Sequence, residues 1–228
     1  MSAIPDVREI PGPVGPLEVL FDAPVGDPRA VVVFAHPLPT HGGSMHTKMV
    51  FHGAKGLTRV GCLVMRFNFR GVGRSAGTFD EGRGEQDDFR AALDFVSASF
   101  PELEVWAAGA SFGAYIAMMA GARDQRVTAL IGVAAPVAKR DFGFLKASEK
   151  PKFLIHGEVD DVIPLRAVRA LYAQLPEPKE LVVIDRANHL FEGQASEVGD
   201  ALEELLAGFR AGDPGPARAG SDKSQGRS

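Results

Sequence analysis

Six short runs of apolar residues alternate along the chain with stretches that have the pattern of amphipathic helices. Each run is apolar throughout, which is typical of strands buried on both faces of a parallel sheet. The predicted strands cover residues 30–36, 61–67, 104–109, 127–133, 152–157 and 180–185. The predicted helices cover residues 47–59, 85–99, 112–122, 165–174 and 194–209. This alternation predicts an α/β fold whose mostly parallel central sheet has helices on both faces. Residues 7–23, "VREIPGPVGPLEVLFDA", are broken by Pro and Gly and are predicted to form an antiparallel hairpin at the sheet edge.

Length and composition predict a single cytoplasmic domain. The chain has 228 residues and a formal net charge of −4, without a basic stripe, which argues against a nucleic-acid partner. Its one cysteine, Cys62, lies in an apolar run where a packing role is expected. Residues 1–15 lack the pattern of a signal peptide, and no apolar run is long enough to span a bilayer. We therefore expect one domain over residues 1–210 and a disordered tail over residues 211–228. No membrane partner is expected, and the oligomeric state stays open between a monomer and a homodimer.

The pattern Gly-x-Ser-x-Gly occurs twice, as "GRSAG" at residues 73–77 and "GASFG" at residues 109–113. It marks a nucleophile elbow, in which the serine lies on a sharp turn directly between a strand and a helix. The second copy meets this requirement, because a predicted strand precedes it and a predicted helix follows at once. The first copy is separated from its strand and is followed by a loop sequence. We therefore predict that Ser111, and not Ser75, is the nucleophile.

A serine nucleophile needs a base, and the base needs an acid that orients it. In α/β-type hydrolases the acid follows the serine in the chain and the histidine comes last. His189 follows the last predicted strand, at the sheet edge where ligands bind, and is the predicted base. His156 lies inside a strand and is expected to support the core or the next turn. The acid should come from the loop between them, where Glu158, Asp160 and Asp161 are candidates.

Acyl transfer also needs two backbone amides that stabilise the developing oxyanion. Phe112, directly after the nucleophile, is predicted to supply one of them. The loop after the first predicted parallel strand, "AHPLPTHGG", is predicted to supply the other at Leu38.

Neither a metal nor a nucleotide cofactor is expected. His36, His41, His46 and His52 cluster in the sequence, but they lack the H-E-x-x-H spacing and a nearby acidic ligand. The stretch "GVGRSA" matches a dinucleotide fingerprint, yet no helix opens directly after it.

Three motifs, "HPLPTHGGSMHTK", "RFNFRGVGRSAGTFDEGRGEQDD" and "GASFGAYIA", closely resemble those of a family of small, lidless bacterial α/β-hydrolases related in shape to dienelactone hydrolases. In addition, "HGEVDDVIP" is similar to the H-G-x-x-D-x-x-V/I-P signature of α/β-hydrolases, whose aspartate falls on Asp160. The resemblance implies the α/β-hydrolase fold and a triad of Ser111, Asp160 and His189. It also implies that Arg70 braces the site, and Leu38 stands where the family often has the second histidine of H-P-H-P.

The segment between the strands that end at residue 133 and start at residue 152 has room for one short helix, and not for a cap domain. We therefore expect an open, shallow site with Phe142, Phe144 and Leu145 as its walls. The predicted function is a serine hydrolase that cleaves small carboxylic esters or thioesters through an acyl-enzyme on Ser111. A hydrolase of short peptides and a non-catalytic binding or scaffold protein remain alternatives.

Overall fold

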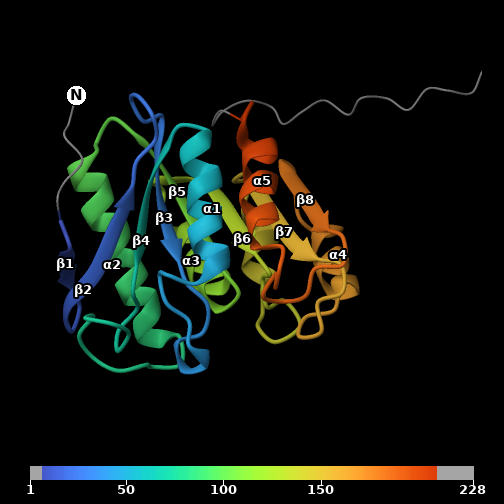
Figure 1. Cartoon of the computed structure of the whole chain (residues 1–228), viewed down its shortest axis with the longest axis horizontal. Coiled ribbons are helices and arrows are strands. Elements are labelled where there is room, and N and C mark those ends of the chain that lie inside the picture. Colours follow the sequence, from blue (N-terminus) through green and yellow to red (C-terminus); the bar gives the residue numbers. More distant parts are fainter. Residues whose placement is uncertain (1–6, 210–228) are drawn as a thin grey trace, which may run out of the picture.

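A central eight-stranded sheet organises the computed structural model, which describes residues 7–209. The strands are β1 (Glu9–Gly12), β2 (Gly15–Asp22), β3 (Ala30–Ala35), β4 (Cys62–Phe67), β5 (Glu104–Ala110), β6 (Val127–Val133), β7 (Lys152–Gly157) and β8 (Lys179–Ile184). Their order across the sheet is β1-β2-β4-β3-β5-β6-β7-β8 (Figure 1). Strands β3 to β8 are parallel, while β1 and β2 form an antiparallel hairpin paired with β4. The predicted fold class and hairpin are confirmed. The predicted tail, residues 211–228, lies outside the described residues.

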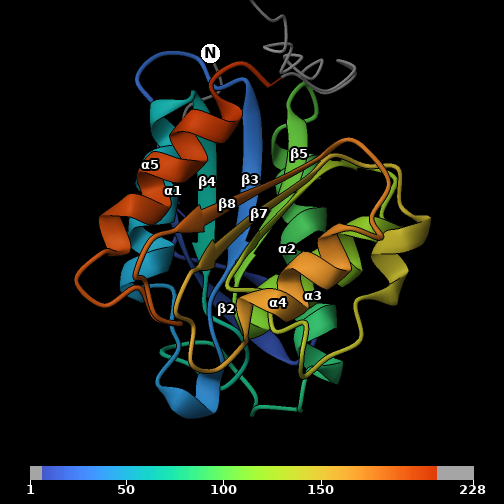
Figure 2. The same cartoon turned by 90° about the vertical axis from the view of Figure 1, so that its right-hand side faces the viewer.

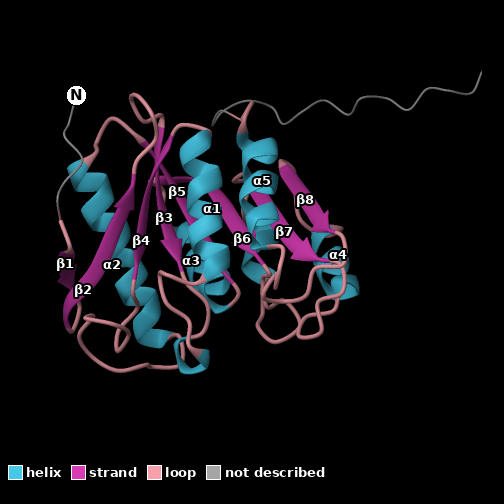
Figure 3. Ribbon diagram, viewed as in Figure 1, coloured by secondary structure: helices cyan, strands magenta, loops and turns pink. Residues whose placement is uncertain are grey.

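Helices cover both faces of the sheet (Figure 2). They are α1 (Lys48–Arg59), α2 (Arg83–Ser99), α3 (Phe112–Arg123), α4 (Leu165–Tyr172) and α5 (Ala195–Leu206), with short 3-10 helices η1 (Pro39–His41) and η2 (Gly143–Ala147). Helices α1 and α5 lie on one face, and α2, α3 and α4 on the other. Figure 3 shows that strands and helices alternate along most of the chain, as the apolar pattern predicts.

The parallel strands are apolar throughout because each face of the sheet is covered. In β3, Val31 and Val33 belong to the core under α2 and α3, whereas Val32 and Phe34 belong to the core under α1 and α5. All four side chains are fully buried, and each contributes about 1.5–3 kcal/mol of hydrophobic stabilisation. Residues 134–151, between β6 and β7, hold only the short helix η2 and no cap domain.

Helices α1 and α5 touch through their backbones. A Cβ atom on Gly56 of α1 would lie 2.1 Å from the carbonyl oxygen of Gly199 in α5, so only glycine fits there. Beside this contact, Arg59 of α1 forms ion pairs with Asp200 and Glu203 of α5. Within residues 7–209, none of the helices has both the length and the apolar character needed to cross a membrane.

Candidate active site

Ser111 lies at the tight turn between β5 and α3, as the glycine pattern predicts. Its φ of 50° and ψ of −117° are strained for a residue with a side chain. The Ser111 amide donates a 2.8 Å hydrogen bond to the Val133 carbonyl, which fixes the turn against β6. A Cβ on Gly109 would lie 2.2 Å from the Gly113 carbonyl oxygen. The two glycines therefore let the chain fold back tightly enough to present the serine side chain.

Ser111, His189 and Asp160 form a hydrogen-bonded chain across three strand ends. Ser111 Oγ lies 2.9 Å from Nε2 of His189, and Nδ1 of the same ring lies 2.8 Å from Oδ2 of Asp160. Ser111 follows β5, Asp160 follows β7 and His189 follows β8. With the proton on Nδ1 donated to Asp160, Nε2 is free to accept the Ser111 hydroxyl proton.

Of the three candidate acids on the loop after β7, Asp160 is the one hydrogen-bonded to His189. Oδ1 of Asp160 accepts hydrogen bonds from the amides of Val162 (2.8 Å) and Ile163 (2.7 Å), so its orientation is fixed. Burial works to raise the pKa of the Asp160 carboxyl, but the hydrogen bonds from His189 and these amides outweigh it and hold the pKa below its usual value. Glu158 instead accepts from the Arg186 amide, and Asp161 is exposed.

His156, near the end of β7, supports the same loop. Its Nε2 donates to the Ile163 carbonyl at 2.9 Å and lies 3.4 Å from Oδ2 of Asp160. The side chain is buried, and burial lowers the pKa of the imidazole, so the neutral ring is favoured. Its Nδ1 has no hydrogen-bond partner among residues 7–209. The expectation that His156 supports the next turn is confirmed.

His36 holds the loop after β3. Its Nδ1 donates to the Pro37 carbonyl at 2.6 Å and its Nε2 accepts from the Phe69 amide at 3.1 Å, an arrangement that needs the neutral ring. Burial lowers the pKa of His36 to about 4, against the opposite effect of the bond to Pro37. A Cβ on Gly113 would lie 2.5 Å from the His36 carbonyl oxygen, so this loop packs directly against the nucleophile turn.

Phe112 and Leu38, the two residues predicted to supply amides, lie close in the chain to this contact: Phe112 precedes Gly113, and Leu38 belongs to the loop after His36. Phe112 is the first residue of α3, where an N–H has no acceptor within the helix. Leu38 lies two residues after His36 and immediately before η1.

The side chains of the loop after β4 are engaged in hydrogen bonds and an ion pair within the protein. Ser75 is buried; its Oγ donates to the Asn68 carbonyl at 2.6 Å and accepts from the Glu18 amide at 2.9 Å. Arg70 forms a two-point ion pair with the buried Asp88 of α2, with 2.7 Å between Nη2 and Oδ1. The hydrogen bond to Asp88 raises the pKa of Arg70 further. Arg70 therefore braces the loop, as the resemblance implies.

No group of three or more His, Cys, Asp or Glu side chains lies close enough together to hold a metal ion in the part of the chain that the structure describes. Cys62 is buried, and burial raises the pKa of its thiol to about 11, so it stays protonated and packs in the core.

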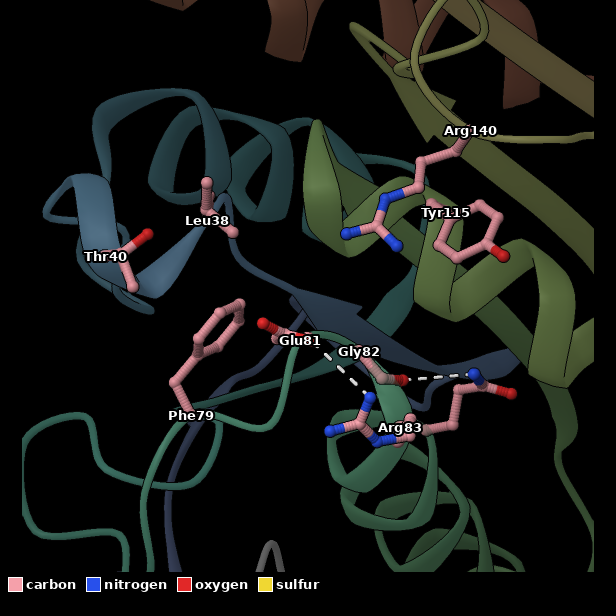
Figure 4. A pocket seen from close by; sticks show the side chains of 9 residues that line it. Leu38, Thr40, Phe79, Glu81, Gly82, Arg83, Tyr115 and Arg140 are labelled. Carbon is pink, nitrogen blue, oxygen red and sulfur yellow. Dashed lines mark hydrogen bonds and ion pairs between the residues drawn. The ribbon is translucent and has the colours of Figure 1, made fainter.

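A cleft of about 550 Å³ lies between the loop after β3, the loop that leads into α2, the start of α3 and the loop after β6 (Figure 4). Its lining residues are Leu38, Thr40, Phe79, Glu81, Gly82, Arg83, Gln86, Tyr115 and Arg140.

The three residues predicted as walls of the site do not line this cleft. Leu145 has no exposed surface, because it packs in the core under α3. Phe142 is nearly buried and lines a second, smaller cleft of about 370 Å³, and Phe144 stacks on it with 5.6 Å between ring centroids. Both rings pack against Tyr115, and it is Tyr115 that lines the larger cleft.

Sequence analysis missed Tyr115 and Arg140. Tyr115 lies four residues after Ser111, so helical spacing alone places it on the same side of α3 one turn further on. Arg140 carries no comparable signal, since its loop holds several charged residues and only the folded chain shows which one points into the cleft.

Comparisons with known proteins show the family of this chain. Residues 26–147, more than half of the chain, match the Hydrolase_4 family, described as serine aminopeptidase, S33. An uncharacterised protein of Rickettsia prowazekii is 32% identical over 204 residues, which are 86% of each chain.

Two solved structures share the fold closely. An α/β serine hydrolase homologue from Coxiella burnetii has a TM-score of 0.83 and 40% identity, and the match covers 87% of this chain and 96% of that one. A protein of Xanthomonas campestris, described as an α/β serine hydrolase without a lid, has a TM-score of 0.80 and 38% identity, with 86% and 90% covered. The chain belongs to the Hydrolase_4 family of α/β-hydrolases.

Proposed function

We propose that this protein is a serine hydrolase that cleaves small carboxylic esters or thioesters through an acyl-enzyme on Ser111. The observation that carries the proposal is the continuous chain from Ser111 Oγ through both nitrogens of His189 to Asp160, with links of 2.9 Å and 2.8 Å. Such a chain is the arrangement that activates a serine hydroxyl.

In the proposed mechanism, Ser111 Oγ attacks the acyl carbon while its proton moves to Nε2 of His189. Asp160 holds the ring in the required tautomer and stabilises the imidazolium. The amides of Phe112 and Leu38 stabilise the oxyanion of the tetrahedral intermediate. His189 then protonates the leaving group, which departs as an alcohol or a thiol. A water molecule repeats the sequence on the acyl-enzyme, with His189 as its base, and releases the acid.

The preference for small substrates rests on the open cleft. Residues 134–151 form no cap that would enclose a long acyl chain, and a cleft of about 550 Å³ suits a small ligand. The apolar side chains of Leu38 and Phe79 offer surface for a few methylene groups.

The test is replacement of Ser111 by Ala, assayed with p-nitrophenyl butyrate and with butyryl thioester. Loss of the nucleophile should lower kcat by at least about 10³-fold, because alanine has no hydroxyl oxygen to attack the acyl carbon. A fluorophosphonate probe should label the wild-type protein and leave Ser111→Ala unlabelled.

The matched control is Ser75→Ala, which changes the serine of the other Gly-x-Ser-x-Gly copy and should keep most of the activity and all of the labelling. If neither protein is labelled and neither ester is turned over, a binding or scaffold role replaces the proposal. Cleavage of aminoacyl-p-nitroanilides in preference to esters would instead favour a short-peptide hydrolase.

A further inference from the structure

Arg140 lines the cleft and lies over two aromatic rings at the start of α3. Its guanidinium carbon lies 5.4 Å from the centre of the Tyr115 ring and 6.0 Å from that of Phe112, both within cation–π range. Phe112 and Tyr115 are the first and fourth residues of α3, directly after Ser111. Figure 4 shows the guanidinium pointing into the cleft, between Leu38 and Tyr115.

The charge of Arg140 has no carboxylate partner within residues 7–209, unlike the other cation of the cleft. Arg83 forms ion pairs with Asp80 at 2.7 Å and with Glu81 at 3.5 Å, which neutralise it. A cation–π contact attracts the charge but leaves the N–H groups of the guanidinium edge available, and that edge matches the two oxygens of a carboxylate. Arg140 thus presents to the cleft a guanidinium edge that no carboxylate of the described residues occupies.

We propose that the cleft selects esters that carry a free carboxylate and that Arg140 is the specificity-determining residue. This inference rests on the proposed hydrolase function. Arg140 binds the carboxylate of the substrate, while Leu38 and Phe79 contact the methylene groups between it and the scissile bond. The same charge disfavours the α-ammonium group that an aminopeptidase substrate would bring.

The carboxylate has two possible sources, the acyl group and the leaving group, and paired substrates separate them. Mono-p-nitrophenyl adipate and p-nitrophenyl hexanoate have acyl chains with the same number of carbons and differ in the terminal carboxylate. 4-Carboxyphenyl hexanoate and phenyl hexanoate differ in the same way on the leaving-group side. In each pair the ratio of kcat/KM values, charged over neutral, measures the preference.

Arg140→Gln should lower this ratio about tenfold in one of the two pairs, mainly through a higher KM for the charged ester. Arg140→Lys should restore part of the ratio, because the charge returns without the planar edge. Lys139→Gln is the matched control: it removes an exposed charge from the adjacent residue outside the cleft and should keep the wild-type ratio. An unchanged ratio in both pairs for Arg140→Gln overturns the inference, while Ser111-dependent turnover of the neutral esters leaves the proposed function standing.

Calorimetric titration with adipate provides a readout that does not depend on turnover. The wild-type protein and Lys139→Gln should bind the dianion, and Arg140→Gln should bind it about tenfold more weakly. If no ester is hydrolysed but adipate binding depends on Arg140, the hydrolase proposal fails and the anion site stands. If adipate does not bind, or binds equally to wild type and Arg140→Gln, the carboxylate site is overturned.

Discussion

At the scale of single residues, the proposed nucleophile has a strained backbone conformation. Ser111 keeps its positive φ because its amide is bonded to Val133 and because glycines at 109 and 113 leave space that no Cβ would fit. This strain presents the side chain toward His189 and explains why a short glycine pattern predicts the position of the turn.

The role proposed for Asp160, to orient His189, leads to a prediction on activity. In Asp160→Asn the amide oxygen retains the hydrogen bonds from Val162 and Ile163, but the NH₂ group faces Nδ1 of His189. The ring must then carry its proton on Nε2, which no longer accepts the Ser111 proton. We expect kcat for p-nitrophenyl butyrate to fall on the order of 10⁴-fold at neutral pH, with the near-UV circular dichroism unchanged.

Asp161→Asn is the control, because it removes the same charge from the same loop at an exposed position. Its activity should stay within about twofold of wild type. A severe loss in Asp161→Asn with near-normal Asp160→Asn would place the acid one residue further along.

The sequence predicts the positions of the triad residues along the chain better than it predicts which side chains line the site. Ser111 and His189 were placed by strand ends, which apolar patterns reveal. Asp160 could not be separated from its neighbours by pattern alone and needed the resemblance. Walls are harder to predict because exposure depends on tertiary packing: Leu145 is apolar and was expected at the surface, yet in η2 it is buried in the core.

At the scale of elements, the contact between α1 and α5 shows how two helices fix one face of the sheet. Gly56 and Gly199 let the helix backbones touch, and Arg59 adds ion pairs at the exposed edge of the contact. Partly exposed ion pairs contribute at most about 1 kcal/mol, so the close packing of the backbones is the stronger constraint.

Gly56→Ala should therefore destabilise the protein, although alanine favours helices. The propensity gain is at most about 1 kcal/mol, whereas overpacking costs about 1–3 kcal/mol, and here the added methyl meets a backbone carbonyl that cannot rotate away. We expect urea denaturation to show a net loss of about 1–2 kcal/mol in unfolding free energy. The control, Gly208→Ala, has nothing within 4 Å of the added Cβ and should change stability by less than about 0.5 kcal/mol. A Gly56→Ala protein as stable as wild type would mean that the helices separate at little cost.

Element positions followed closely from the sequence, and element ends less so. β6 and β7 match their predicted bounds, whereas α5 ends at Leu206 and not at residue 209. Phe209 lies beyond the helix end, and its ring packs on Trp106 of β5 and Phe153 of β7. Hydrophobic periodicity cannot distinguish such a packed end from another helical turn.

At the scale of the whole molecule, buried histidines tie stability to pH. Burial lowers the pKa of His36 to about 4 and that of His156 below its usual value. Between pH 6.5 and about 4, the unfolded chain binds a proton on His36 that the folded protein does not, so stability falls as the pH falls through this window. The low pKa of Asp160 adds a further loss only below its usual value of 3.8.

Urea denaturation at pH 7.5 and 4.5 tests this dependence. The wild type should lose on the order of 2–3 kcal/mol of unfolding free energy between the two values through His36. His36→Gln should be less stable at pH 7.5, since it disturbs the bonds to Pro37 and Phe69, but should lose less on acidification. His46→Gln, at an exposed position, should follow the wild-type curve. A curve for His36→Gln that runs parallel to wild type would show that His36 does not cause the loss.

Strand β8 is expected to unfold locally before the rest of the sheet. His189 follows β8, which within residues 7–209 lies at the sheet edge, pairs with β7 alone and has one buried residue, Ile184. A local opening that frees β8 removes the proposed base while the remaining strands stay paired. Fewer molecules are then active than are folded. As stress increases, we expect activity to be lost before the whole sheet unfolds.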